Sequence, residues 1–149
     1  MMNRKRQKQP SNPMTSDIGP DNYPGTLECA KWYKALLQKL YGEVPTKYFG
    51  EYISLSVDGV ARVWITVRKN GRAFIEVKHG EENFQEAVDH LNGEGISFGT
   101  RRGKYLTFNV NVQQLKDKAT THEWLASRLS PQKLMLRQFM GDWQYSATR

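Results

Sequence analysis

Residues 51–78, EYISLSVDGVARVWITVRKNGRAFIEVK, decide the fold of this chain. They contain three segments rich in Val, Ile and aromatic residues, separated by Asp58-Gly59 and Asn70-Gly71, which are strong hairpin-turn signals. Apolar side chains fall on alternate positions, as is typical of strands with one buried face. The alternating set is Ile53, Leu55, Val57, Ala61, Val63, Ile65, Val67, Ala73, Ile75 and Val77. The stretch therefore predicts three consecutive antiparallel strands.

The register of the second hairpin can be tested against this alternation, because a slip of one residue moves every side chain to the other face. A two-residue loop would put the apolar residues of one strand beside charged residues of the next. A three-residue loop, with Lys69-Asn70 in a type I turn and a left-handed Gly71 as a bulge, pairs Val67 with Ala73. We expect the three-residue loop.

This register gathers aromatic and basic side chains on the face opposite the apolar one. The set is Arg62, Trp64, Thr66, Arg68, Arg72, Phe74, Glu76 and Lys78, with Tyr52 and Tyr105 as further candidates. Aromatic planes stack on unpaired bases and arginines contact phosphates, so the mixture favours single-stranded DNA or RNA as the partner. The alternative is that a helix covers this face and makes Trp64 and Phe74 core residues.

Composition narrows the class of protein. Among 149 residues, 22 Lys and Arg stand against 15 Asp and Glu, and the formal net charge of +7 favours a polyanionic partner. The single cysteine, Cys29, excludes an internal disulfide and a cysteine-based zinc site, and we expect it to be a small buried residue. No apolar run is long enough to span a membrane, and the basic start lacks the apolar stretch of a signal peptide. We expect a soluble, cytoplasmic protein with no membrane partner.

The positive charge is concentrated in two segments. Residues 1–25 hold four of the six prolines, so we expect a disordered arm whose basic residues Arg4, Lys5 and Arg6 contact phosphates; a merely solubilising tail is the alternative. The second segment is a glycine-flanked loop, 99–103, and its basic residues are Arg101, Arg102 and the neighbouring Lys104. Residues 26–149 are expected to form a single domain.

Helical periodicity and capping signals predict the remaining elements. We expect helices at 26–41, 81–92 and 120–129, strands at 96–98 and 104–112, and a helical turn at 113–119. Thr26 is the expected N-cap of the first helix, and 120–123 the expected capping box of the last of these. Ser130-Pro131 predicts a C-terminal helix over 131–143, which either covers the core or binds another protein.

The expected element order is α-β-β-β-α-β-β-α-α. It predicts an α+β fold with a single, mostly antiparallel five-stranded sheet and helices packed on one face.

Three residues raise an enzymatic alternative. Asp58, Glu76 and Lys78 follow the order of a D…ExK signature, and the elements predicted over 26–98 resemble the restriction-endonuclease-like fold. The resemblance implies that Asp58 and Glu76 bind Mg²⁺ while Lys78 assists the attacking water. Asp58 departs from the family pattern because it lies in a glycine turn instead of on a strand. A solvated strand face is the other interpretation of Glu76 and Lys78.

The whole element order, with KYFGEYISLSV at 47–57 leading into the first strand, also resembles a small uncharacterised α+β domain appended to predicted nucleases and DNA-modification proteins. That resemblance implies a nucleic-acid context and transfers no catalytic motif.

Other catalytic signatures are absent from the sequence. His79, His90 and His122 do not form a ligand cluster by spacing, and His90 and His122 are expected at the surface. There is no glycine-rich phosphate loop and no dinucleotide fingerprint. The sequence therefore predicts a non-enzymatic nucleic-acid-binding module without a cofactor. A Mg²⁺-dependent nuclease and a protein-binding adaptor that uses the C-terminal helix remain the alternatives.

Overall fold

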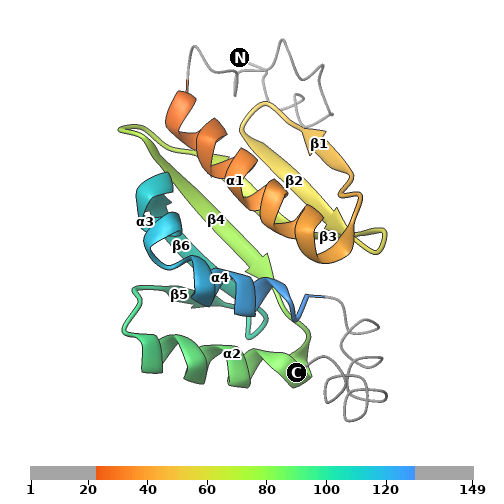
Figure 1. Cartoon of the computed structure of the whole chain (residues 1–149), viewed down its shortest axis with the longest axis vertical. Helices are drawn as coiled ribbons and strands as arrows, with labels where there is room; N and C mark the ends of the chain where they lie inside the picture. Colours follow the sequence, from red (N-terminus) through yellow and green to blue (C-terminus); the bar gives the residue numbers. More distant parts are fainter. Residues whose placement is uncertain (1–22, 130–149) are drawn as a thin grey trace.

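Six strands form one antiparallel sheet in the computed structural model, which describes residues 23–129. In spatial order they are β1 (Thr46–Tyr48), β2 (Tyr52–Val57), β3 (Val60–Val67), β4 (Arg72–Lys78), β6 (Tyr105–Asn111) and β5 (Gly99–Arg101). The helices of this part of the chain are α1 (Pro24–Tyr41), α2 (Glu81–Glu94), α3 (Val112–Asp117) and α4 (Ala119–Ala126). In Figure 1, α1, α3 and α4 lie in front of the sheet and α2 lies below α4. The predicted α+β class with a single antiparallel sheet is confirmed.

The expectation of five strands was wrong, because residues 46–48 add a short edge strand, β1, that pairs with β2. Three residues are too few for a visible alternation, so the sequence gives no sign of this strand, which forms by pairing with β2. The expected strand at 96–98 was also misplaced, since β5 begins at Gly99 and pairs there with Thr107. A Cβ atom at Gly99 would lie 2.7 Å from Thr107 Oγ1, so a glycine permits this close pairing. The element order is α-β-β-β-β-α-β-β-α-α.

The predicted register of the β3–β4 hairpin is confirmed, because Val67 pairs with Ala73. The turn itself differs from the expected type I turn. Asn70 and Gly71 both have positive φ, 61° and 75°, and a hydrogen bond of 3.3 Å joins the residues that flank them. This is the pattern of a two-residue hairpin turn. One extra residue, Arg68, therefore lies between Val67 and the turn, and this bulge brings Val67 opposite Ala73.

The side chain of Thr26 supports this irregular turn. Its hydroxyl group accepts the N–H of Arg68 at 3.2 Å and donates to the carbonyl oxygen of Arg72 at 2.6 Å. Thr26 is therefore not the N-cap of α1, which begins at Pro24 after Tyr23. Proline suits the first helical position because the N–H that it lacks would have no partner within the helix.

A second irregularity lies between β2 and β3. Leu55 pairs with Val63, whereas Ser56 pairs with Ala61, so Arg62 is an additional residue on β3. Ala61 therefore faces Ser56 and does not continue the buried row, contrary to the simple alternation.

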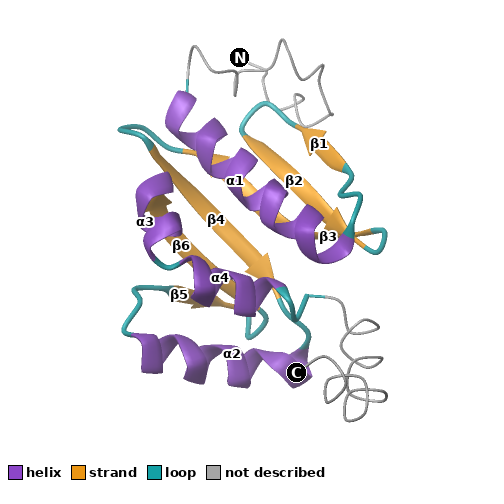
Figure 2. Ribbon diagram, viewed as in Figure 1, coloured by secondary structure: helices purple, strands orange, loops and turns teal. Residues whose placement is uncertain are grey.

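The expected capping box at 120–123 was wrong, because α4 begins at Ala119 and no side chain caps it. Lys118 alone lies between the end of α3 and the start of α4, and Figure 2 shows the two helices following one another. The capping box forms at the start of α3, where the Asn111 side chain accepts the N–H of Gln114 and the Gln114 side chain accepts the N–H of Asn111.

The core lies between the inner sheet face and the helices. Its largest fully buried side chains are Tyr33, Leu37, Ile53, Leu55, Ile65, Ile75, Leu91, Leu106, Phe108, Leu115 and Leu125. Cys29 is buried among them, as expected, and burial raises the pKa of its thiol to about 11. Within residues 23–129 no helix combines the length and the apolar character that crossing a membrane requires.

Candidate nucleic-acid interface

The second face of the sheet, which we call the outer sheet face, lies opposite the described helices (Figure 1). The strand registers place one continuous row of side chains across it, Lys47, Ser54, Trp64, Glu76 and Thr107. The neighbouring rows add Tyr52, Thr66, Phe74, Asn109, Arg72, Lys78, Tyr105 and Arg101. Most of these side chains are partly exposed. The aromatic and basic set predicted from the alternation is therefore brought together, with Arg62 as an exception.

Trp64 lies at the centre of this face. It is partly exposed, and no helix among residues 23–129 packs over it. The edge of its ring contacts Tyr105, with 5.8 Å between the ring centroids and 61° between the planes. At the β2 end, Tyr52 stacks on Phe49 at 4.5 Å. Trp64 is thus neither fully open nor buried under a helix, and its environment consists of other outer-face side chains.

Arg101 links the β5–β6 hairpin to the sheet. Its Nε atom donates to Glu76 Oε2 at 2.9 Å, its Nη2 atom donates to the same oxygen, and its guanidinium group lies 4.6 Å from the ring centroid of Tyr105. Arg102 and Gly103 both have positive φ in the turn that follows. A shallow pocket of about 350 Å³ results, and it is lined by Tyr52, Trp64, Thr66, Glu76, Arg101, Arg102 and Tyr105.

Two more arginines are held at the other end of the outer sheet face by neutral partners. Arg68 lies 4.9 Å over the ring of Phe74. Arg72 donates through Nε to the Asn109 side chain at 3.3 Å and through Nη2 to the Asn109 carbonyl oxygen at 2.6 Å. The ion pairs between described residues include neither arginine. Both cations are therefore positioned without having their charge neutralised by an adjacent carboxylate.

The other predicted basic residues take different places. Arg62 is the bulge residue of β3, and its Nε atom is buried without a hydrogen-bond partner among residues 23–129. Lys104 lies in the β5–β6 turn, where its carbonyl oxygen accepts the N–H of His79 at 2.8 Å. Arg4, Lys5 and Arg6 lie outside the described residues, as does the expected helix at 131–143.

The structure does not bring the candidate nuclease residues together. Asp58 lies in the β2–β3 turn, whereas Glu76 pairs with Trp64, four residues along β3 from Val60. At about 3.3 Å per residue this is roughly 13 Å of strand, far more than two ligands of one Mg²⁺ ion can span. Glu76 is also bonded to Arg101. No three His, Cys, Asp or Glu residues in the described part of the chain could hold a metal ion.

One feature was missed by sequence reasoning. A hollow of about 500 Å³, which we call the edge pocket, lies beside β6 and is lined by Arg72, Phe74, Gly95, Ile96, Ser97, Phe98, Gly99, Thr107, Asn109, Val110, Gln114, Asp117, Lys118 and His122. His122 was expected at the surface but is 1% exposed. The only local signal is the pair of glycines at 93 and 95, of which Gly95 ends α2 and precedes an irregular segment.

Comparison with protein-family models, curated proteins and solved structures finds no match to this chain. Both family resemblances therefore stay predictions, and the geometry of the outer sheet face carries the functional argument.

Proposed function

We propose that this protein is a non-enzymatic module that binds single-stranded DNA or RNA on its outer sheet face. The observation that carries the proposal is the arrangement of Trp64, Tyr105 and Phe74 on a face without a described helix, beside arginines held by neutral groups. Stacking of a base on an aromatic ring contributes about 1–3 kcal/mol, and arginine adds phosphate and cation–π contacts. Bases in a duplex are stacked on each other, so such a face favours unpaired strands.

The distribution of charge supports the same partner. Residues 23–129 contain 15 of the 22 Lys and Arg and 12 of the 15 Asp and Glu, so this part carries a formal charge of only +3. Five of the 12 acids are in α2, which lies away from the outer sheet face. Among the residues in the strand rows of that face, Glu76 is the single acid, whereas four residues are basic: Lys47, Arg72, Lys78 and Arg101. The outer sheet face is therefore more basic than the average surface.

Affinity for an unstructured oligonucleotide is expected to fall linearly with salt on a double-logarithmic plot, because bound phosphates release counterions. Fluorescence anisotropy with a labelled single strand, titrated at several salt concentrations, measures the slope. A hairpin-free duplex of the same sequence is the control and is expected to bind more weakly at each salt concentration. A flat salt response, or no binding at low salt, contradicts the proposal.

Replacing Trp64 with leucine is expected to weaken single-strand binding by about 1–3 kcal/mol, because the stacking surface is lost while the sheet keeps an apolar cover. The matched control is Trp124→Leu, since Trp124 stacks on His90 at 3.9 Å between α4 and α2 and does not belong to the outer sheet face. Anisotropy gives the affinities, and denaturant midpoints show that both variants fold. Equal affinity for the Trp64 variant and the parent chain would remove Trp64 from the site.

A further inference from the structure

The edge pocket continues the outer sheet face beyond Gly99, the first residue of β5. β5 pairs with β6 only as far as Gly99, opposite Thr107, so the following residues of β6 face the irregular segment 95–98. Phe74 and Asn109 belong both to the outer sheet face and to the wall of the pocket. Its volume of about 500 Å³ falls within the range of small-ligand sites, roughly 300–1,000 Å³.

The walls of the edge pocket combine apolar rings with polar side chains. Phe74 contributes from β4, and Ile96 and Phe98 contribute from the segment before β5. Asn109 and Gln114 add amide groups whose N–H groups can donate to a ligand, while their oxygens already accept hydrogen bonds from Arg72 and from the Asn111 backbone. A planar ring with a polar edge suits such a lining better than a flexible apolar chain does.

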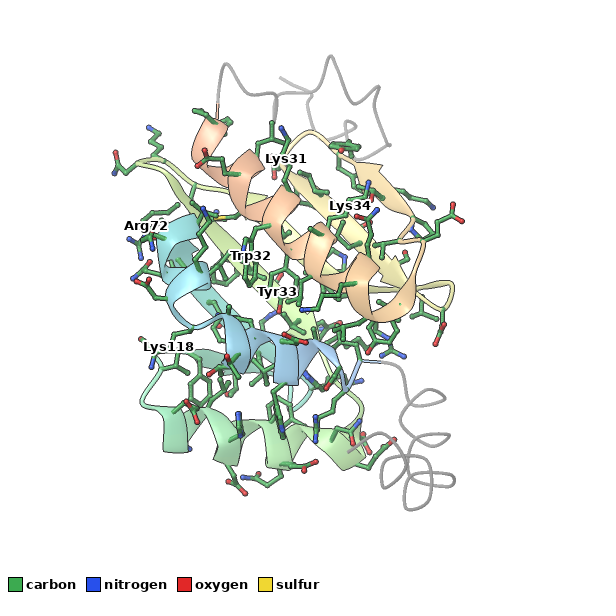
Figure 3. All side chains as sticks on the ribbon, in the orientation of Figure 1. Lys31, Trp32, Tyr33, Lys34, Arg72 and Lys118 are labelled. Atoms are coloured by element: carbon green, nitrogen blue, oxygen red, sulfur yellow. The ribbon has the colours of Figure 1, made fainter. Side chains whose placement is uncertain are left out.

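His122 supplies the independent sign of a ligand. It lines the pocket and is 1% exposed, yet its Nδ1 atom has no hydrogen-bond partner among residues 23–129. A buried polar atom without a partner costs about 1–3 kcal/mol. The hydroxyl group of Tyr33 is also unpartnered within this part of the chain, and its ring lies 6.0 Å from the His122 ring. Tyr33 belongs to α1, and Figure 3 shows its label just below the ribbon of that helix.

The charge around the edge pocket is predominantly positive. Arg72 and Lys118 both line it, and Figure 3 shows them on the same flank of the molecule beside α3. Lys118 also donates to the Glu94 carbonyl oxygen at 3.4 Å. The one carboxylate in the lining, that of Asp117, accepts a hydrogen bond of 2.9 Å from Gln113.

We infer that the edge pocket receives one unpaired nucleobase from a strand bound on the outer sheet face, with the adjoining phosphates near Arg72 and Lys118. The inference rests on the proposed function and specifies which part of the bound strand the pocket recognises. The base ring lies between the phenylalanine walls, and its edge meets the amides and the neutral imidazole. Flipped or splayed bases are read in this way, by apolar contact on the ring and hydrogen bonds on its edge.

The test blocks the edge pocket without touching the stacking surface. Ser97 lines the pocket and is exposed, so Ser97→Trp fills the entrance, while Gln85→Trp adds the same ring at an exposed position of α2. His122→Phe keeps a ring in place and removes its nitrogens. It is a second test of the pocket, and it replaces Ser97→Trp if that variant does not fold. Each variant is titrated with a labelled oligonucleotide, with versions that carry a single abasic position, and with free mononucleotides.

We expect Ser97→Trp and His122→Phe to bind the intact oligonucleotide on the order of tenfold more weakly than Gln85→Trp, which corresponds to about 1.4 kcal/mol. An abasic position is expected to weaken binding to the parent chain and to have no further effect on Ser97→Trp.

The opposite results separate the two proposals. If Ser97→Trp, His122→Phe and Gln85→Trp all bind like the parent while Trp64→Leu binds weakly, the edge pocket inference falls and the proposed function stands. If mononucleotides bind in the pocket but no strand binds, or if nothing binds, both fall.

Discussion

Acidification from pH 7 to pH 4 is expected to lower the free energy of unfolding by roughly 6 kcal/mol through two buried histidines, His79 and His122. His79 is fully buried and its Nε2 atom lies 3.2 Å from the carbonyl oxygen of Leu125. Burial lowers its pKa from 6.5 to about 4, against a smaller opposing effect of its backbone hydrogen bonds and with a further lowering by the charges of Arg62 and Arg128.

His122 reaches the same pKa, about 4, through burial alone. Its ring lies among the rings of Trp32, Tyr33 and Phe108, at centroid distances between 5.1 and 6.1 Å. These aromatic rings provide no counter-charge for an imidazolium ion, so His122 is neutral in the folded state at pH 7.

The direction of the pH effect follows from these values. Below pH 6.5 the histidines of the unfolded chain bind protons, whereas those of the folded chain stay neutral until about pH 4. The contribution of the two neutral histidines to the free energy of unfolding is therefore fully present above pH 6.5, and it is lost as the pH falls towards 4. A pKa difference of about 2.5 corresponds to roughly 3 kcal/mol for each histidine.

Denaturant unfolding at a series of pH values measures this loss. His79→Gln, which keeps a donor for Leu125, and His122→Phe are each expected to remove about half of the slope between pH 6.5 and pH 4. His90→Gln is the control, because His90 is partly exposed and stacks on Trp124. Parallel curves for all three variants and the parent would overturn the assignment.

Gly25→Ala is expected to destabilise the protein by about 3 kcal/mol, because the first turn of α1 lies directly on the β3–β4 turn. A Cβ atom at Gly25 would lie 2.6 Å from the carbonyl oxygen of Gly71 and even closer to its Cα atom. Backbone atoms cannot rotate away as a side chain does. The helix must shift, which also pulls the Thr26 hydroxyl group away from Arg68 and Arg72.

Gly93→Ala is the matched control, since Gly93 also lies inside a helix but a Cβ atom there would have no neighbour within 4 Å. Alanine is the better helix former, so this variant is expected to be more stable by about 0.5–1 kcal/mol. Thermal or denaturant unfolding compares the two. Destabilisation of similar size in both variants would show that the contact between Gly25 and Gly71 is not the cause.

The β3–β4 register was predictable because its determinants are local. Alternation along 51–78 and the glycine turn specify which side chains share a face, and a wrong register would bury Glu76 in place of Ile75. The same alternation was sufficient to gather Trp64, Phe74 and the arginines of the candidate interface. Arg62 escaped the prediction, because a bulge inserts one residue without leaving a pattern in the sequence.

Long-range contacts explain three of the features that the sequence pattern misassigned. Thr26 carries the local signature of a helix cap, but its hydroxyl group binds a turn 42 residues away. His122 resembles a surface residue of a capping box, but the docking of α4 against α1 and β6 buries it. Asp58 and Glu76 are likewise separated because Asp58 lies in the β2–β3 turn, whereas Glu76 lies opposite Trp64 in the middle of the sheet.

The sequence by itself therefore determined the four longer strands, the β3–β4 register and most of the composition of the outer sheet face, because periodicity and turn residues act within a few positions of the chain. Only the tertiary structure decided which polar side chains are buried, how far Trp64 is covered, and that segment 95–98 leaves a pocket beside β6. The physical reason is that burial depends on atoms brought together from distant parts of the chain, and no local pattern encodes their packing.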